Sequence, residues 1–368
     1  MRIIIAAGGT GGHLYPGIAI AREIKKIDRK VEILFAVTEK AMDKEIVKKE
    51  GFECFSLPSK GLLGKSVKEK AIFPIFLMAG IVVFLGVFLN KKPCVIIGTG
   101  GYASFVPLFI GIILGRPTII SEQDSYPGLT TRLLSRFVTE VHIAHIKAKQ
   151  CLGSTKNVYL TGNPLRDTLF EGTRLDAITY FKLKKGMKTV LILGGSHGAR
   201  SINKAFVEVI KHHKFPNIQF IFQTGESDYN WVVGSLKGND EDVKILPFID
   251  KMNLAYSAAD LVFSRAGALA IAEISARGLP SVLIPFPYAT GGHQEENARY
   301  MQKRGASIMM LDKELETDKI VKVLDSLLNN REKLKMMSEK ALSVFRKDAA
   351  KRIAERALIL GGKKRSVS

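Results

Sequence analysis

The stretch "RIIIAAGGTGGHLYPGIAIAREIKKI", residues 2–27, sets out the local architecture from which the first domain is built. The apolar run "RIIIAA" predicts a buried strand, and "PGIAIAREIKKI" has the apolar spacing of a helix. Between them lie four glycines, a threonine and a histidine. Glycine allows close approach to the backbone, and a helix N-terminus presents unpaired N–H groups with positive partial charge. Strand, glycine turn and helix in this order predict a cradle for phosphate.

The same order of strand, glycine turn and helix recurs along the chain. Short apolar runs such as "VEILFAV", "KPCVIIGTGG", "RPTIISEQ" and "EVHIAH" alternate with helical stretches, and after a polar stretch the series restarts with "TVLILGGSHGARSINKAFVEVI". Such runs predict parallel sheets covered by helices on both faces. We therefore expect an α/β protein of two Rossmann-like domains, with ligand loops at the carboxyl ends of the strands and a binding cleft between the domains.

The loosening and restart of this pattern place the domain boundaries. The 368 residues are more than one core usually organises. We expect the first domain over residues 1–162, a linker over 163–187 and the second domain over 188–340. The last helical stretch has the composition to pack on either domain.

Charge and cysteine content narrow the classes of partner. The formal net charge is +20, which attracts nucleic acid, nucleotides or an anionic lipid surface. The chain has no zinc-finger spacing and no compact basic helix, so we expect no nucleic-acid partner, and solvated lysine-rich faces remain an alternative. The start "MRIIIAAGG" lacks the features of a secretory signal peptide. Three cysteines without CxxC or metal-ligand spacing predict a reducing compartment: Cys54, Cys94 and Cys151.

Residues 71–89, "AIFPIFLMAGIVVFLGVFL", carry no charge and are long enough to cross a membrane. Pro74, Gly80 and Gly86 interrupt the run, and a strand with a glycine loop follows it at once. Lysines flank it on both sides. This profile favours a segment lying in a membrane interface, with a plain buried helix and a true span as the alternatives.

The glycine turns match neither of the commonest nucleotide motifs. "GGTGGH" is not GxGxxG, and no GK[ST] follows it, which counts against a nicotinamide dehydrogenase and a Walker A site. One such turn alone needs no ligand, because tight turns use glycine for geometry. Two further turns, "GTGGY" (98–102) and "GGSHGA" (194–199), also follow strands. Together they suggest several phosphorylated ligands, or a diphosphate clamped between domains.

The second domain adds polar groups at two expected helix starts. In "SRAGALAIAE", Glu273 is placed to accept hydrogen bonds from a ribose diol. The alternative is an ordinary glutamate near a helix N-terminus, where the helix dipole stabilises negative charge. In "GGHQEENAR", Gln294 is placed to bind a sugar hydroxyl or to cap a helix. The acidic run at 240–242 lacks the preceding strand of a metal-binding DxD, and His142 and His145 fit a core or surface better than ligation. We expect neither metal nor cofactor.

Seven motifs together carry a family resemblance that covers about residues 1–355. They are "GGTGGHLYP", "GTGGYASFVP", "SEQD", "GNPLR", "GGSHGARSIN", "SRAGALAIAE" and "PFPYATGGHQEENA". In this order they resemble the MurG family, the peptidoglycan UDP-N-acetylglucosamine:lipid I N-acetylglucosamine transferases. The resemblance implies the GT-B glycosyltransferase fold, with a C-terminal helix, 341–358, returning to the N-terminal domain.

The resemblance also implies a reaction and a location. The reaction is transfer of GlcNAc from UDP-GlcNAc to the C4 hydroxyl of lipid I, with inversion of the donor, to make lipid II. Inversion by one displacement needs an in-line hydroxyl, a base and stabilisation of the departing diphosphate. The implied partners are UDP-GlcNAc, lipid I and an anionic membrane surface. The implied location is the cytoplasmic side of the cell membrane, as a peripheral protein.

Family positions carry over onto matching residues of this chain. Those implied to contact the donor are Thr10, Gly11, Gly12, Asp124, Arg166, Ser196, Ile249, Ala268, Leu269, Ala270, Glu273 and Gln294. Ser196 would meet the diphosphate, Ile249 the uracil through its backbone, and Glu273 the ribose. Arg166 would supply a cation near phosphate or uracil, unless it serves a linker salt bridge.

The acceptor side offers two candidate bases. His13 is a candidate base or ligand of the acceptor diphosphate, because imidazole titrates near neutrality. Glu122 is the rival base, and Tyr102 and Ser104 are expected on the acceptor side. Asp124 and Ala270 stand where the family usually has asparagine and threonine, and each change would weaken donor binding by roughly 1–2 kcal/mol if that hydrogen bond is normally made.

Other functions remain open on the sequence. A UDP-sugar diacylglycerol transferase and a UDP-GlcNAc 2-epimerase share the fold, although the apolar 71–89 stretch disfavours the epimerase. An inactive scaffold would fit the changes at Asp124 and Ala270. A nucleic-acid protein would show salt-sensitive duplex binding without catalysis.

Overall fold

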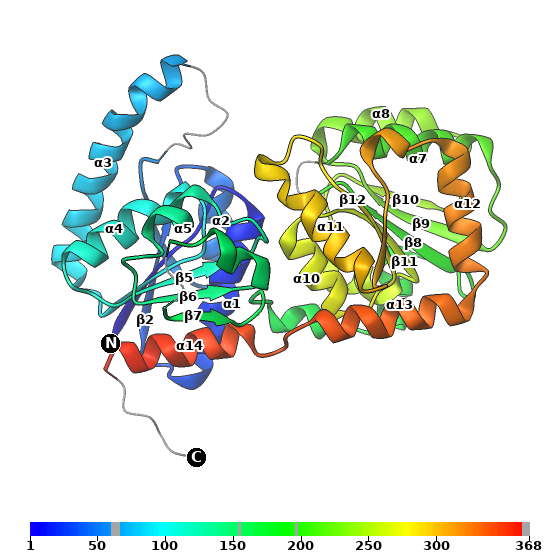
Figure 1. Ribbon diagram of the computed structural model, residues 1–368. Helices are drawn as coiled ribbons and strands as arrows, with labels where there is room; N and C mark the ends of the chain where they lie inside the picture. Colours follow the sequence, from blue (N-terminus) through cyan, green and yellow to red (C-terminus); the bar gives the residue numbers. More distant parts are fainter. Residues whose placement is uncertain (60–66, 154–155, 196–197, 363–368) are drawn as a thin grey trace. The chain divides into compact units, whose positions relative to one another are not determined.

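The chain divides into two compact units. The computed structural model describes residues 1–59, 67–153, 156–195 and 198–362. Unit 1 comprises Met1–Arg166 with Arg346–Ser368, and unit 2 comprises Asp167–Phe345. Each unit contains one parallel sheet with helices packed on it (Figure 1). This arrangement confirms the predicted fold class of two parallel-sheet α/β units.

Unit 1 is built on a sheet of seven parallel strands. In spatial order they are β3 (Glu53–Ser56), β2 (Glu32–Val37), β1 (Arg2–Ala6), β4 (Val95–Gly98), β5 (Thr118–Glu122), β6 (Glu140–Ile143) and β7 (Val158–Leu160). Ile4 of β1 lies beside Leu34 of β2 and Ile96 of β4. The strand order reverses between β1 and β4, and the carboxyl edge at such a reversal is where sheets of this kind bind ligands.

Helices cover both faces of this sheet. They are α1 (Gly11–Ile27), α2 (Ala41–Lys49), α3 (Val67–Lys91), α4 (Phe105–Ile113), α5 (Leu129–Leu134) and α14 (Ala349–Leu360), with short helices η1 (Tyr102–Ser104) and η2 (Ile146–Cys151). Ile3 and Ile5 point to the core shared with α1 and α14, whereas Ile4 and Ala6 point to the core shared with α3 and α4. This alternation is the period of two that a strand buried on both faces requires.

Unit 2 repeats the arrangement with six parallel strands. In spatial order they are β10 (Val243–Leu246), β9 (Ile218–Gln223), β8 (Lys188–Leu193), β11 (Leu261–Arg265), β12 (Ser281–Ile284) and β13 (Ser307–Met309). Phe222 of β9 and Phe263 of β11 lie on either side of Ile192, in the buried core of the unit. Here the order reverses between β8 and β11.

The helices of unit 2 also lie on both sides of its sheet. They are α6 (Arg174–Phe181), α7 (Arg200–His212), α8 (Glu226–Leu236), α9 (Met252–Ala258), α10 (Ala268–Ala276), α11 (His293–Lys303), α12 (Thr317–Leu328) and α13 (Arg331–Val344), with η3 (Asp167–Phe170), η4 (Thr290–Gly292) and η5 (Asp312–Glu314). The predicted linker, 163–187, thus contains η3 and α6, and its residues from Asp167 belong to unit 2.

Two helices differ from their predicted bounds. α1 begins at Gly11, five residues before the expected start at Pro16, so the second pair of glycines forms its first turn. The single helix expected over 341–358 is instead the end of α13 and most of α14. Phe345 separates them, because its ψ of 138° is extended rather than helical.

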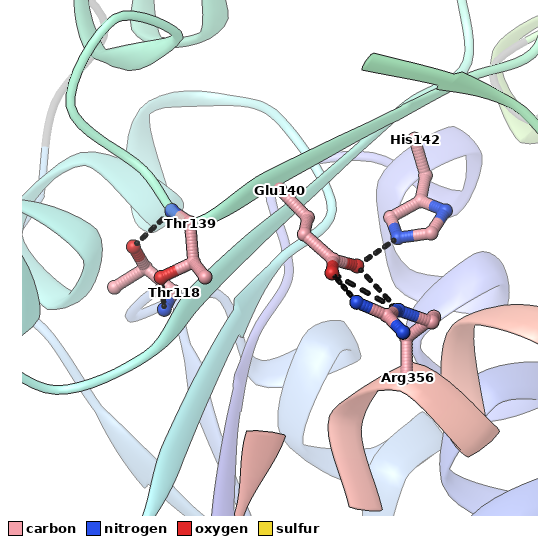
Figure 2. Close-up of polar contacts among 5 residues, drawn as sticks. All are labelled: Thr118, Thr139, Glu140, His142 and Arg356. Atoms are coloured by element: carbon pink, nitrogen blue, oxygen red, sulfur yellow. Dashed lines mark hydrogen bonds and ion pairs between the residues drawn. The ribbon is translucent and has the colours of Figure 1, made fainter. Parts of the chain in front are cut away.

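α14 packs on unit 1 through apolar side chains. An ion pair between Arg356 and the buried Glu140 carboxylate also holds it there (Figure 2). Arg356 Nε donates to both carboxylate oxygens of Glu140 on β6, at 3.0 and 3.2 Å, and Arg356 Nη2 contacts the same carboxylate. His142 Nε2 lies 3.1 Å from Glu140 Oε2, and its ring stacks on Tyr159. Burial raises the pKa of Glu140, but the hydrogen bonds from His142 and Arg356 outweigh it, so the pKa lies below its ordinary value.

α3 is long, apolar and largely exposed. Its window Ile72–Lys91 is long and apolar enough to cross a membrane, and 17% of that window is buried in the described structure. Phe84 and Phe88 pack into the core of unit 1, and a Cβ at Gly80 would lie 2.8 Å from the carbonyl oxygen of Pro58. The outer face leaves Ile75 67% exposed. A wholly buried helix, one alternative from the sequence, is therefore wrong.

Candidate active site

The first glycine loop of unit 1 ends on an open helix N-terminus. Gly8 and Gly9 follow β1 with φ values of 153° and 89°, which favour glycine. Thr10 is exposed, caps α1 through its backbone and makes no side-chain capping bond. Among the described residues, the amides of Gly11 and Gly12 have no hydrogen-bond partner, as expected for a first helical turn. This end of α1 is therefore suited to bind an anion.

His13 projects from the first turn of α1 toward the residues that directly follow β4 and β5. Its Nδ1 lies 3.1 Å from the carbonyl oxygen of Thr99 and 3.3 Å from Oε1 of Gln123. The Gln123 amide nitrogen donates to the Ser121 carbonyl at 2.9 Å, which orients its oxygen toward the imidazole. Both atoms facing Nδ1 are acceptors, so the tautomer that fits these contacts carries its proton on Nδ1 and its lone pair on Nε2.

The second glycine loop lies directly against His13. Gly100 and Gly101, at φ 96° and 69°, follow β4, and a Cβ on Gly100 would lie 2.8 Å from His13 Nδ1. Tyr102 places its ring within 3.4 Å of the position of a Cβ on Gly9, so the first and second loops meet. Ser104 is fully buried, and its hydroxyl faces the carbonyl oxygens of Ala6 and Gly100 at 2.8 and 2.7 Å. Ser104 supports the loop from inside.

Glu122 ends β5 and organises the loop that follows. Its carboxylate accepts hydrogen bonds from the amides of Asp124 and Gly128 at 3.1 and 3.2 Å. The side chain is buried, and burial raises the pKa of Glu122, with the nearby Asp124 carboxylate raising it further. A raised pKa suits a general base, but both oxygens are engaged by the loop. Asp124 itself is partly exposed.

Arg166, at the end of the first segment of unit 1, lies against the first turns of α1. Its guanidinium carbon is 3.9 Å from the centre of the Tyr15 ring, and its Nη1 is 3.7 Å from Glu50 Oε1. Stacking on Tyr15 places this cation beside the helix that begins at Gly11, and the looser approach to Glu50 matches the salt-bridge alternative. Arg166 thus adds positive charge near the same helix.

In unit 2 the loop after β8 leads into α7. Gly198 has a φ of 77°, and a Cβ there would lie 2.0 Å from the carbonyl oxygen of Thr224, so only glycine fits without a shift of the backbone. Asn203, fully buried on α7, donates to the Thr224 carbonyl and to Asp228, both at 2.8 Å. Ser196, an expected diphosphate contact, lies outside the described residues.

The loop after β11 begins α10, which carries four of the expected donor residues. Ala268 is buried, while Leu269, Ala270 and Glu273 are partly exposed. Glu273 accepts a hydrogen bond from the Tyr256 hydroxyl at 3.0 Å, which orients the carboxylate. Gln294 of α11 accepts from the Phe286 amide at 3.0 Å through its Oε1.

Ile249 lies after β10 with a buried side chain. Within the described ranges, its backbone N–H and C=O make no hydrogen bond to other residues. Since backbone polar groups of folded chains are normally paired, this open pair is suited to read an edge of a planar ligand.

Arg265, the last residue of β11, is a polar centre of unit 2 that lies within the motif "SRAGALAIAE" but was not among the expected site residues. It is nearly buried and donates to Ser201 Oγ at 2.8 Å and to Asp312 Oδ1 at 2.5 Å. It also donates to the carbonyl of Pro285 at 3.2 Å. Arg265 therefore links the segments that follow β8, β12 and β13 at the carboxyl edge of the sheet. A charged residue ending an apolar strand is the signal in the sequence that could have found it.

Among the described residues, no three His, Cys, Asp or Glu side chains are grouped as metal ligands would be. In the acidic run at 240–242, Asp240 accepts from the Gly238 amide and Asp242 pairs with Lys184. His142 is committed to the Glu140 contact described above.

Two parallel-sheet units, each with a glycine loop and a helix N-terminus where its strand order reverses, have the architecture of the GT-B class. Residues 3–143 match the glycosyltransferase family 28 N-terminal domain, and residues 189–353 match its C-terminal domain. A protein of Thermodesulfovibrio yellowstonii is 40% identical, covering 99% of this chain and 100% of that protein. Its name is UDP-N-acetylglucosamine–N-acetylmuramyl-(pentapeptide) pyrophosphoryl-undecaprenol N-acetylglucosamine transferase, and an Acetivibrio thermocellus protein of the same name is 38% identical, covering 96% and 97% of the two chains. The chain belongs to the MurG family of glycosyltransferases.

Solved structures agree with the fold. The crystal structure of Acinetobacter baumannii MurG has a TM-score of 0.74 at 23% identity, covering 97% of this chain and 99% of that one. A UDP-GlcNAc 2-epimerase from Neisseria meningitidis, bound to UDP-GlcNAc, has a TM-score of 0.72 at 15% identity, covering 98% and 100%. Both likenesses establish the fold alone, which transferases and epimerases share.

Proposed function

We propose that this enzyme transfers GlcNAc from UDP-GlcNAc to the C4 hydroxyl of lipid I, undecaprenyl-diphospho-MurNAc-pentapeptide, with inversion at the anomeric carbon. The observation that carries the proposal is the 40% identity over 99% of the chain to a transferase named for this reaction. The geometry around His13 supports it, because a basic imidazole nitrogen stands beside an anion-binding helix N-terminus.

In the proposed step, His13 acts as the general base. The acceptor O4 forms a bond to the anomeric carbon of the donor while the bond from that carbon to the diphosphate oxygen breaks. UDP leaves with the electron pair, and the O4 proton passes to Nε2 of His13. The bond between Nδ1–H and the Thr99 carbonyl holds the imidazole in this tautomer and stabilises the charge that develops on it. In this proposal Glu122 shapes the neighbouring loop by accepting hydrogen bonds from the amides of Asp124 and Gly128.

The donor contacts are proposed mainly from unit 2. Glu273 would accept from the ribose hydroxyls, with the Tyr256 hydroxyl holding its carboxylate in place. The open backbone of Ile249 would read the uracil. Gln294 would offer its amide nitrogen to the sugar, while its oxygen stays on the Phe286 amide. In unit 1, Thr10 to Gly12, Asp124 and Arg166 would complete the donor site, and Tyr102 would face the acceptor.

The reaction is tested with labelled UDP-GlcNAc and a short-chain lipid I analogue, without added metal. We expect a labelled disaccharide with release of UDP and a β anomeric configuration by NMR. Conversion of UDP-GlcNAc to UDP-ManNAc without acceptor would identify an epimerase instead. Bound UDP-GlcNAc with no product from lipid I, but with product from diacylglycerol, would replace the proposed acceptor.

Glu273→Ala is expected to raise the donor KM about tenfold or more, with a smaller change in kcat. The variant removes a charged acceptor of two ribose hydrogen bonds, and hydrogen bonds to charged groups contribute roughly 1.5–3 kcal/mol. Initial rates at varied UDP-GlcNAc measure this. Glu316→Ala, an exposed glutamate of the same unit that pairs with Lys319, is the control and should keep the wild-type KM. An unchanged KM in Glu273→Ala would remove Glu273 from the donor site.

We also propose that the outer face of α3 lies in the membrane interface on the cytoplasmic side, where the lipid acceptor is held. The inner face packs on the core of unit 1 through Phe84 and Phe88, so lipid cannot surround this helix as it surrounds a membrane span. α4 packs beside it and leaves Ile113 63% exposed. Exposed apolar side chains with lysines such as Lys92 nearby fit an anionic lipid surface.

Vesicle binding is expected to fall severalfold in the triple variant Ile75→Ser, Met78→Ser, Val82→Ser. These side chains are 67%, 58% and 65% exposed, so the change removes apolar surface from the interface without touching the core. Sedimentation with vesicles of phosphatidylglycerol and phosphatidylethanolamine measures it. The matched control, Leu175→Ser with Met336→Ser, changes exposed apolar residues of unit 2. Equal sedimentation of the wild type and the α3 variant would contradict the interfacial proposal.

A further inference from the structure

We propose that Asp43 and Lys40, from the connection between β2 and α2, are positioning residues that hold the first glycine loop so that His13 is set for catalysis. The inference rests on the proposed function of His13. Neither residue belongs to a motif of the sequence: Asp43 lies 34 residues after Gly9, within a lysine- and glutamate-rich helix. Nothing in that local pattern points to the loop.

The two side chains bind the two polar backbone groups of Gly9. Asp43 Oδ2 accepts from the Gly9 amide at 2.8 Å, and Lys40 Nζ donates to the Gly9 carbonyl at 2.7 Å. The Tyr102 ring lies 3.4 Å from the position that a Cβ on the same glycine would take. The N–H and the carbonyl of Gly9 are therefore held by one segment of unit 1, and Tyr102 of a second segment packs beside its α-carbon.

The Asp43 carboxylate is fully buried, and its contacts fix its position. Its Oδ2 also accepts from the Thr38 hydroxyl, and it lies in the first turn of α2, where the helix dipole favours negative charge. A Cβ on Gly8 would lie 2.7 Å from Oδ2, so the loop fits closely over the carboxylate. In dinucleotide-binding sheets an acidic residue after the second strand binds ribose. Here the acidic group is turned onto the glycine loop and is closed to a ribose.

The contacts with Gly9 hold the segment that leads into α1 and to His13. Gly9 immediately precedes Thr10, whose carbonyl accepts from the His13 and Leu14 amides to start α1. His13 must then meet the Thr99 carbonyl at 3.1 Å to hold its tautomer. Removing Asp43 leaves the Gly9 N–H buried without an acceptor, and the loop has to move to satisfy it. The shift would be felt at His13, whereas the donor contacts in unit 2 would be untouched.

The kinetic test compares three variants in the full-length enzyme. Asp43→Ala is expected to lower kcat about 30-fold, with the donor KM within about threefold of wild type. Asp43→Asn keeps an oxygen facing the Gly9 amide and should lose less than about fivefold. Lys40→Met, at an exposed residue that does not endanger folding, should lower kcat severalfold. The control is Asp260→Ala. It removes a carboxylate that accepts from the Thr189 amide at 2.8 Å, at the amino ends of the strands of unit 2. It should keep wild-type kcat per folded molecule.

A second readout does not depend on transfer. The ¹⁵N chemical shifts of the His13 ring report which nitrogen carries the proton. The wild type should show the Nδ1–H tautomer, and Asp43→Ala should show a mixture, restored in Asp43→Asn. If the wild type has no transferase activity but these shifts behave as expected, the proposed function fails and the positioning role stands. An unchanged tautomer and an unchanged kcat in folded Asp43→Ala would overturn the positioning role.

Discussion

His13→Ala is expected to lower kcat by about 10²- to 10⁴-fold, the range contributed by a positioned general base. The donor KM should change much less, because the proposed nucleoside contacts, Glu273 and Ile249, lie in unit 2. Nδ1 of His13 is committed to the Thr99 carbonyl, so the variant removes the one ring nitrogen able to take the acceptor proton. Steady-state rates at saturating UDP-GlcNAc and lipid I analogue measure the effect.

His212→Ala is the control for His13→Ala. His212 lies on the surface of unit 2 beside Glu208, away from the glycine loops, and its loss should leave kcat unchanged. Wild-type turnover in His13→Ala would show that another group is the base. A large rise in the KM for lipid I with unchanged kcat would instead assign His13 to binding of the acceptor diphosphate.

Arg356→Ala is expected to destabilise unit 1 by about 3 kcal/mol. It leaves the Glu140 carboxylate buried, with His142 as its remaining side-chain partner (Figure 2). This loss is at the low end for broken buried pairs because the Arg356 side chain is 32% exposed. Hydrogen exchange of the β6 and α14 amides measures the local loss in the intact chain. Arg352→Ala, on the exposed side of the same helix, should have little effect.

The same ion pair predicts an acid dependence of stability. The pKa of Glu140 is lowered from its ordinary value of 4.5, so the folded state favours the ionised carboxylate. Its contribution is present above pH 4.5 and is lost as the pH falls through the lowered value. Arg356→Ala should flatten this part of the stability curve. An equally steep acid loss in the variant would show that other groups cause it.

The class of fold and the places of the glycine loops can be read from the order of the amino acids alone. Strands such as "RIIIAA" and their glycine turns are local features, because burial on both faces requires continuous apolar runs and a positive φ favours glycine. The loops at residues 8–12 and 98–102 are therefore evident from local pattern, whereas His13 becomes a candidate base only through the resemblance to the family. The start of α1 differs from its predicted place because Pro16, which favours a first turn, lies inside the helix.

The roles of individual side chains, by contrast, depend on how distant segments pack. His13 and Glu122 are equal candidates for the base on the sequence; in the fold Glu122 points into its own loop and His13 meets the Thr99 carbonyl. Asp43 meets Gly9 across 34 residues, and Arg356 meets Glu140 across 216. Local patterns set which residues form strands and helices, since these depend on spacing within a few turns. Which distant groups share a hydrogen bond depends on strand order, register and helix packing, and these are properties of the folded chain as a whole.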